Sequence, residues 1–416
     1  MRVLAVEHTG GIDLFRGKWE WLCRYPDVEL TVLAPETWIE NSRLVRTDPR
    51  VEGYRVLTGR VAWRGYENRG FFYTGLARAI RETRPEVLHL VEEQFSLFAL
   101  QSVALQRMLA PAAKVLFYTA DNLHRRFRYA YRPSWTYGLI DRAVQRLSDC
   151  GVACSSDARD VLLARGFTKP IRFVPLGLDP LHFRKQETAE LRDRLGLRGF
   201  VVGFAGRLLA MKGIYVLAEA LEGASFDWTW LVVGNGPEKE SLLARARARG
   251  WERRLRIVEA VPHGGVPDYI NLMDALVLPS LTTRVWREQF GRVLVEAMSC
   301  EIPVIGSSSG SIPEVVGEAG RITPEGDARA LGEALAELAG NAWLRARLGA
   351  AGRARALRHF TWEKAAAQYK AIYDGLLDGS LASERAPAWA QTDGTDDDGL
   401  HAGDAAPIPR SARGGG

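Results

Sequence analysis

Two glutamates, Glu288 and Glu296, stand eight positions apart in the stretch REQFGRVLVEAMSC of residues 287–300. On one helix this spacing gives about 80° of rotation and roughly 12 Å of rise, so the two carboxylates would not share a face. Gly291 lies between them, and a helix that begins near residues 289–291 leaves Glu288 in the preceding loop. The free N–H groups at the start of that helix form a binding site for an anion, with a carboxylate on either side.

Two cations follow another strand-like run, FVVGFAG, at residues 200–206. Gly206 ends this run, and Arg207 and Lys212 come after it. Arginine binds phosphate oxygens in pairs and lysine acts as a point charge, so the two predict a clamp for a diphosphate. Ligands of open parallel sheets bind at the carboxyl ends of strands, where both motifs fall. Carboxylates accept hydrogen bonds strongly, so hydroxyl groups are suitable partners for the two glutamates. A ligand with hydroxyl groups on both sides of a diphosphate is a nucleotide-sugar, and the combined pattern predicts such a ligand.

Apolar runs of strand length alternate with longer helical patterns along the chain, which indicates an α/β protein with parallel sheets covered on both faces. One set of runs lies at 2–8, 28–35, 87–93, 114–120, 150–155 and 171–177, and a second at 200–206, 228–236, 255–261, 274–280, 302–308 and 319–326. The two sets predict two doubly wound domains in tandem, at 1–178 and 179–360. We expect a helix at 361–377 to pack back on the first domain, and the tail 378–416 to be disordered because it is poor in aliphatic residues.

A net charge of +5 and an isoelectric point near 9.0 indicate a basic surface. Such a surface suits nucleic acid, a phosphorylated substrate or an acidic membrane. The segment 125–132, RRFRYAYR, mixes arginine with aromatic residues. It fits a membrane surface or a lipid-diphosphate acceptor, or else a helix that packs its aromatic residues inward.

The four cysteines lack the spacing of a metal site. Without an apolar run of about 18 residues or a signal peptide, we expect a cytoplasmic protein, peripheral on the inner face of the membrane at most.

Four segments resemble a known family: FAGRLLAMKG (204–213), VGNGPE (233–238), the stretch from Arg287 to Val316, and HFTWEKAA (359–366). They are similar to the nucleotide-sugar domain of the large retaining glycosyltransferase family usually numbered four. The resemblance covers about residues 170–375, and HTGG (8–11), 87–96 and 118–127 extend it weakly toward bacterial polysaccharide-type transferases. It implies the GT-B fold, with two Rossmann-like domains facing across a cleft. It also implies transfer of a hexose-like sugar to an acceptor hydroxyl, with retention and without a metal or another cofactor, in the synthesis of cell-surface polysaccharide or glycolipid.

The resemblance also implies roles for individual residues of the second domain. Arg207 and Lys212 would bind the diphosphate, Glu288 would contact the donor sugar, and Glu296 would bind the ribose hydroxyls. The backbone of Gln289, Phe290 and Gly291 would lie over the sugar and phosphates, with Val293 and Leu294 near the nucleoside.

The first domain would bind the acceptor. The Gly10–Gly11 turn would approach the donor, and Glu92 and Glu93 are candidate acceptor contacts. Many relatives carry a histidine in the loop after the fourth strand, where this chain has TADNLHR. Asp121, His124 and His8 are therefore candidates for contacting the donor sugar or acceptor, and for each a structural role is an open alternative. The acceptor itself is a saccharide, a lipid-linked sugar or a small molecule.

Two other functions are consistent with α/β domains and a basic surface. An NAD-dependent oxidoreductase would carry G-x-G-x-x-G after the first strand, but EHTGGIDLF does not supply it. A basic RNA-binding protein would show an aromatic RNA-binding signature, which the chain lacks. We therefore expect no nucleic-acid partner.

Overall fold

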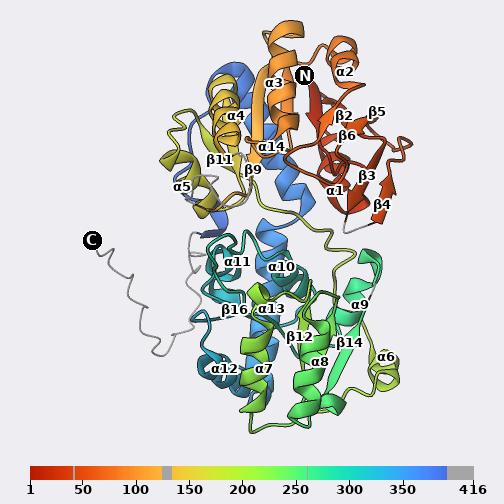
Figure 1. Cartoon of the computed structure of the whole chain (residues 1–416), viewed down its shortest axis with the longest axis vertical. Helices are drawn as coiled ribbons and strands as arrows, with labels where there is room; N and C mark the ends of the chain where they lie inside the picture. Colours follow the sequence, from red (N-terminus) through yellow and green to blue (C-terminus); the bar gives the residue numbers. More distant parts are fainter. Residues whose placement is uncertain (41–42, 124–133, 260, 391–416) are drawn as a thin grey trace.

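The computed structural model describes residues 1–40, 43–123, 134–259 and 261–390, and it shows two α/β domains one above the other (Figure 1). The N-terminal domain has a seven-stranded sheet in the order β11-β10-β9-β8-β1-β2-β5, and every neighbouring pair of strands is parallel. Its strands are β1 (Arg2–Val6), β2 (Glu29–Pro35), β5 (Arg55–Gly59), β8 (Val87–Leu90), β9 (Lys114–Thr119), β10 (Cys150–Ala153) and β11 (Ile171–Phe173). Its helices are α1 (Asp13–Leu22), α2 (Leu76–Thr83), α3 (Leu97–Leu109), α4 (Ser134–Leu147) and α5 (Ser156–Ala164).

The C-terminal domain has a six-stranded parallel sheet in the order β14-β13-β12-β15-β16-β17. Its strands are β12 (Phe200–Ala205), β13 (Trp228–Val233), β14 (Leu255–Val258), β15 (Ala275–Leu278), β16 (Val304–Ser307) and β17 (Arg321–Thr323). Its helices are α6 (Ala189–Arg194), α7 (Ile214–Glu222), α8 (Lys239–Ala248), α9 (Val266–Ile270), α10 (Arg292–Ser299), α11 (Ile312–Val316), α12 (Ala328–Gly340) and α13 (Ala342–His359). The central strands are buried along their whole length, as parallel strands covered on both faces must be.

Each sheet has one place where the order of strands reverses. From β1 the chain proceeds to β2 on one side, and β8 lies on the other side; from β12 it proceeds to β13 on one side, with β15 on the other. Crevices form outside the carboxyl ends of the strands at such switch points. The loops that follow β1 and β8, and those that follow β12 and β15, are therefore the places where this fold can bind a ligand.

The sequence prediction missed β5 and two antiparallel hairpins, β3 (Thr37–Glu40) with β4 (Arg43–Arg46) and β6 (Val61–Ala62) with β7 (Phe71–Phe72). β5 lies at the edge of its sheet and is only partly buried, so it lacks a continuous apolar run. The hairpins carry polar and exposed residues on one face and therefore give no signal of a buried parallel strand.

Helix α14 (Trp362–Asp378) corresponds to the helix predicted at 361–377, and it packs on the N-terminal domain through Trp362, Tyr369 and Tyr373. The backbones of Leu178 and Thr361 form a parallel bridge where the chain returns to this domain. A Cβ at Gly17 would lie 2.2 Å from the Trp362 ring, so only glycine allows α1 to approach α14 this closely. Among the helices in the described ranges, none is both long and apolar enough to span a membrane.

The predicted disorder of the tail 378–416 is wrong for its first part. Ser383 Oγ accepts a hydrogen bond from Ile171 N at 3.2 Å, and Glu384 Oε2 accepts one from Phe173 N at 3.0 Å. Trp389 is 1% exposed and its ring contacts Phe360 and Phe173. This segment is held by Leu381, which packs against the core of the N-terminal domain, by Trp389 and by the hydrogen bonds to an edge strand, although it is poor in aliphatic residues. Residues 391–416 lie outside the described part of the chain.

Candidate active site

The loop after β12 brings Lys212 to the switch point of the C-terminal sheet. Gly206 and Arg207 follow β12 directly and are exposed, and Lys212 ends a short 3-10 helix at Ala210–Lys212. Gly213 has φ +72°, and a Cβ there would lie 1.8 Å from the carbonyl oxygen of Pro279. The loop after β12 therefore packs directly against the loop after β15, and a larger residue than glycine would separate them.

Glu288 lies in the loop after β15 and is buried. Its Oε2 atom accepts hydrogen bonds from Lys212 Nζ and Ser280 Oγ, each at 2.7 Å. The Lys212 ammonium also lies 4.7 Å from the centre of the Trp286 ring. Glu288 and Lys212, which the sequence placed in separate motifs, thus form one ion pair where β12 and β15 end.

Helix α10 begins at Arg292, directly after Gly291, which has φ +78°. Glu288 therefore stands in the loop before the helix and Glu296 stands inside it, so the first N–H groups of α10 lie between the two carboxylates along the chain. Glu296 is buried and pairs with Arg292 at 3.0 Å, one turn earlier on the same helix. Burial raises the pKa of the Glu296 carboxyl, and the neighbouring Arg292 opposes that rise.

The residues around Gly291 differ in how far they are exposed. The Gln289 side chain is exposed and donates a hydrogen bond from Nε2 to Ala120 O at 3.0 Å. Phe290 is buried with its ring 5.7 Å from that of Phe360, and Leu294 is fully buried in the core. Val293 is half-buried. The side chains of Phe290 and Leu294 support the loop and helix, and a ligand here would meet the backbone.

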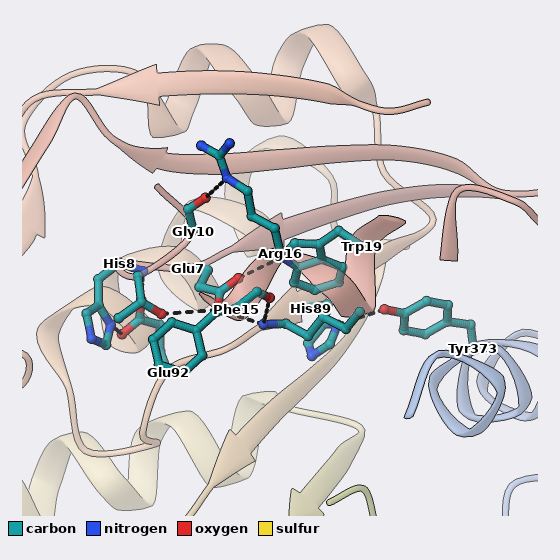
Figure 2. A network of polar contacts seen from close by, with 11 residues as sticks. Glu7, His8, Gly10, Phe15, Arg16, Trp19, His89, Glu92 and Tyr373 are labelled. Atoms are coloured by element: carbon teal, nitrogen blue, oxygen red, sulfur yellow. Dashed lines mark hydrogen bonds and ion pairs between the residues drawn. The ribbon is translucent and has the colours of Figure 1, made fainter. Parts of the chain in front are cut away.

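His8 and Glu92 meet at the switch point of the N-terminal sheet, after β1 and β8 (Figure 2). Glu92 is buried and accepts from His8 twice: Oε1 from the backbone N–H at 2.7 Å, and Oε2 from Nδ1 at 2.8 Å. Burial lowers the pKa of His8, but the charge and hydrogen bond of Glu92 outweigh that effect and raise it to about 9. Glu92, a predicted acceptor contact, is thus occupied by His8, which it orients and keeps protonated at neutral pH.

The other predicted residues of this domain are also engaged with neighbouring groups. Glu93 accepts hydrogen bonds from Thr119 Oγ1 at 2.7 Å and from Ala120 N at 2.8 Å. Burial and the nearby Asp121 raise the pKa of Glu93 to about 8. Asp121 pairs with Arg165 at 2.6 Å. His124 lies outside the described residues.

Arg16 holds the turn at Gly10 and Gly11, since its guanidinium bonds to the carbonyl of Gly10 at 3.3 Å (Figure 2). Gly10 is buried, and a Cβ at Gly11 would lie 2.1 Å from Thr47 Oγ1, so the turn is pressed against the strands behind it.

Behind this turn, Glu7 accepts hydrogen bonds from Lys18 Nζ at 2.8 Å and from Trp19 Nε1 at 2.7 Å. His89 Nδ1 and the Tyr373 hydroxyl are 2.7 Å apart, which ties α14 to the same network. The sequence prediction missed these buried polar residues, because their partners are far apart along the chain.

The loop after β15 touches the N-terminal domain at the loop after β9 and at α5. Asn122 Nδ2 donates to the carbonyl of Glu288 at 2.8 Å, and Arg287 pairs with Asp157 at 3.1 Å. The carboxyl ends of both sheets therefore face one another, with the Lys212–Glu288 pair on one side and the His8–Glu92 pair on the other. Within the described ranges, no group of three or more His, Cys, Asp or Glu residues is arranged to hold a metal ion.

Residues 188–355 match the model of the family described as "Glycosyl transferases group 1". A phosphatidyl-myo-inositol mannosyltransferase of Mycobacterium leprae is 35% identical over 182 residues, which cover 42% of this chain and 46% of that protein. The chain thus spans less than half the length of this curated relative. The segment 188–355, most of the C-terminal domain, is thus similar to the group 1 glycosyltransferases, as the resemblance predicted.

Two solved structures share the arrangement of both domains. The sucrose-phosphate synthase of Thermosynechococcus elongatus superposes with a TM-score of 0.68 at 19% identity, covering 91% of this chain and 100% of that one. HepE of Anabaena, solved in complex with UDP, also superposes with a TM-score of 0.68, at 17% identity, covering 90% of this chain and 100% of that one. At such identities the likeness concerns the fold. With the two parallel sheets, it confirms the predicted GT-B fold with two Rossmann-like domains.

Proposed function

We propose that the protein is a glycosyltransferase that moves a hexose-like sugar from a nucleoside-diphosphate sugar to an acceptor hydroxyl, with retention. The observation that carries this proposal is the Lys212–Glu288 ion pair at the β12/β15 switch point, next to the start of α10. A lysine ammonium has three N–H donors, and Glu288 uses one of them. The remaining donors, the exposed Arg207 and the first N–H groups of α10 would stabilise the negative charge of the departing diphosphate.

In this proposal the C-terminal domain binds the donor. Glu288 contacts the sugar, the backbone at Gln289–Gly291 covers sugar and phosphates, and Glu296 meets the ribose hydroxyls. The N-terminal domain brings the turn at Gly10 and Gly11 toward the donor and offers the acceptor the imidazolium of His8. The acceptor is a saccharide, a lipid-linked sugar or a small molecule, and the product belongs to cell-surface polysaccharide or glycolipid. The protein would work without a metal, in the cytoplasm or at the inner face of the membrane.

Calorimetry with UDP, GDP and ADP, followed by assays of slow donor hydrolysis with the corresponding hexose nucleotides, tests this proposal. We expect one nucleotide to bind and its sugar to be hydrolysed without acceptor. Lys212→Ala should suppress hydrolysis while the far-UV circular dichroism stays unchanged. If the folded protein bound none of the three nucleotides and hydrolysed none of their sugars, the proposed function would be wrong.

A further inference from the structure

An exposed apolar surface with arginines lies on the N-terminal domain, over the β3–β4 hairpin and the turn that follows β6. Four large side chains form its apolar part: Ile39 (41% exposed), Leu44 (64%), Trp63 (57%) and Tyr66 (60%). Three exposed arginines accompany them: Arg46 is on the same face of the hairpin as Ile39 and Leu44, Arg64 is in the turn, and Arg43 is at the start of β4 on the other face. We call these seven residues the hairpin ledge. Apolar side chains that gather in this way on a soluble protein usually mark an interaction site.

The apolar residues of the hairpin ledge lie next to one another. Ile39 and Leu44 are directly opposite in the antiparallel ladder, so their side chains share one face of the hairpin. A Cβ at Gly65 would lie 3.1 Å from Ile39 Cβ, which places the turn of residues 63–66 against that face. Arg64 also donates a hydrogen bond to Thr37 Oγ1 at 2.9 Å, which fixes the turn on β3.

The backbone holds Trp63 in an unfavourable conformation. Its φ of +52° lies in the left-handed region, which bulky residues rarely adopt. The Trp63 ring meets the ring of Phe71 edge-on, with 5.6 Å between the centroids, yet more than half of the side chain stays exposed. Strain that keeps a large aromatic residue at the surface is an observation that points to a function for that residue.

The charge of the hairpin ledge is positive. Among the described residues, no carboxylate lies within ion-pair distance of Arg43, Arg46 or Arg64. Two acids stand beside these residues, Glu40 opposite Arg43 in the ladder and Glu67 after Tyr66, and the three arginines outnumber them. The next acids along the chain, Glu36 and Asp48, pair with Arg60 and Arg50. Exposed aromatic and aliphatic residues among unpaired arginines fit the boundary between the acyl chains and the headgroups of an anionic bilayer.

The β3–β4 hairpin, which carries part of the hairpin ledge, also contacts the candidate site. Trp38 precedes Ile39 on β3 and points to the opposite face, where it is buried with its ring 4.9 Å from that of His8. Figure 1 shows β3 and β4 at the end of the N-terminal domain nearest the C-terminal domain. The β3–β4 hairpin therefore lies between His8 and the hairpin ledge, with Trp38 on one face and Ile39 on the other.

We propose that the hairpin ledge docks the protein on an anionic lipid surface, and that the acceptor is an amphiphile presented from this surface to His8. The second statement rests on the proposed transferase function, whereas the docking stands on the surface alone. Trp63 and Tyr66 enter the headgroup region, Ile39 and Leu44 contact the upper acyl chains, and the arginines face lipid phosphates.

Vesicle flotation tests the docking. One set of vesicles contains phosphatidylcholine alone, and the other contains phosphatidylcholine mixed with phosphatidylglycerol. We expect the protein to float with the mixed vesicles at low salt and to be released by high salt. The double variant Leu44→Ser with Trp63→Ser should bind at least about ten-fold more weakly. Arg46→Ser should weaken binding about five-fold, and only on the mixed vesicles.

Trp343→Ser is the matched control, because Trp343 is 67% exposed but lies on α13 of the C-terminal domain. This variant should float like the unaltered protein. An equal loss of binding in the control, or no flotation of the unaltered protein at low salt, would overturn the docking. Light scattering gives a third outcome: if the unaltered protein is a dimer that the double variant dissociates, the hairpin ledge is a subunit interface and the proposal is wrong.

Donor hydrolysis separates this proposal from the proposed function. The double variant should hydrolyse the donor sugar at an unchanged rate, because the hairpin ledge lies outside the donor site. Flotation without any donor hydrolysis in the unaltered protein would disprove the amphiphilic acceptor along with the transferase function and support the docking. Hydrolysis without flotation would leave the transferase function standing and disprove the docking.

Discussion

Lys212 Nζ lies 2.7 Å from Glu288 Oε2, although the two residues follow different strands and stand 76 positions apart. The pair forms because β12 and β15 are neighbours in the sheet and the loops after them touch at Gly213 and Pro279. A carboxylate that is buried and hydrogen-bonded to Ser280 fixes the ammonium at one place. A fixed cation at the carboxyl end of a parallel sheet is suited to stabilising charge on a leaving group, because it needs no reorganisation during the reaction.

We predict that Lys212→Ala lowers turnover by about two to three orders of magnitude, the usual effect of removing one preorganised electrostatic contact. The measurement is the rate of donor-sugar hydrolysis at saturating donor. Lys185→Ala is the control, because Lys185 also pairs with a glutamate, Glu301 at 3.0 Å, but is largely exposed. Turnover of the Lys212 variant close to that of the control variant would rule out a role for Lys212 in the reaction.

Glu296→Gln should weaken binding of the free nucleoside diphosphate roughly ten- to hundred-fold, as expected for a lost hydrogen bond to a charged group. The substitution keeps the shape of the side chain, and the ion pair with Arg292 is lost at the same time. Calorimetry measures the change. Glu301→Gln, two residues after the end of α10, serves as the control for a general effect of lost charge. Unchanged affinity in the Glu296 variant would exclude the ribose contact.

The His8–Glu92 pair predicts how stability depends on pH. The pKa of His8 rises from 6.5 to about 9 in the folded protein, because Glu92 outweighs the effect of burial. A group with a raised pKa contributes stabilisation that is complete below pH 6.5, declines above it and is lost as the pH passes about 9. The free energy of unfolding, measured by urea titration, should therefore fall between pH 6.5 and 9 in the unaltered protein.

His8→Gln should remove this pH-dependent loss, and so should Glu92→Gln, which takes away the charge that raises the pKa of His8. Both variants should be less stable than the unaltered protein at pH 6.5, and the difference should shrink toward pH 9. A difference that stays constant over this range would show that the pair is not ionised in the folded protein.

The sequence was sufficient for the two parallel sheets and for the start of α10, because continuous apolar runs and a glycine before a helix are local features. The sequence did not show which residues from distant segments would contact one another. Glu92 was predicted to contact an acceptor, but both of its oxygens bind His8, which is 84 positions away. Leu294 was placed near a nucleoside, which stays a prediction, and the structure adds that its side chain is fully buried.

Composition gave a wrong prediction for a segment in which a few residues make the packing contacts. The segment after α14 is poor in aliphatic residues, yet Glu384 bonds to the edge strand β11 and pairs with Arg172 at 2.6 Å. The exposed hairpins went unnoticed for a related reason: their outward face is neither buried nor regularly polar, and only the structure shows that Ile39 and Leu44 lie opposite each other.

The same segment yields a prediction about stability. Trp389 is 1% exposed; its ring centroid lies 5.8 Å from that of Phe360 and 6.4 Å from that of Phe173 in the N-terminal domain, and its carbonyl accepts a hydrogen bond from Arg355. Trp389→Ala should therefore lower the free energy of unfolding by about 3–5 kcal/mol, the usual cost of removing a buried aromatic side chain. Trp343→Ala, at an exposed tryptophan, should change it little. A chain that ends at Gly379 should unfold at a lower urea concentration than the full chain, because Glu384 and Trp389 are both lost. Equal midpoints for all of these chains would mean that the contacts of Glu384 and Trp389 do not hold the two domains together in solution.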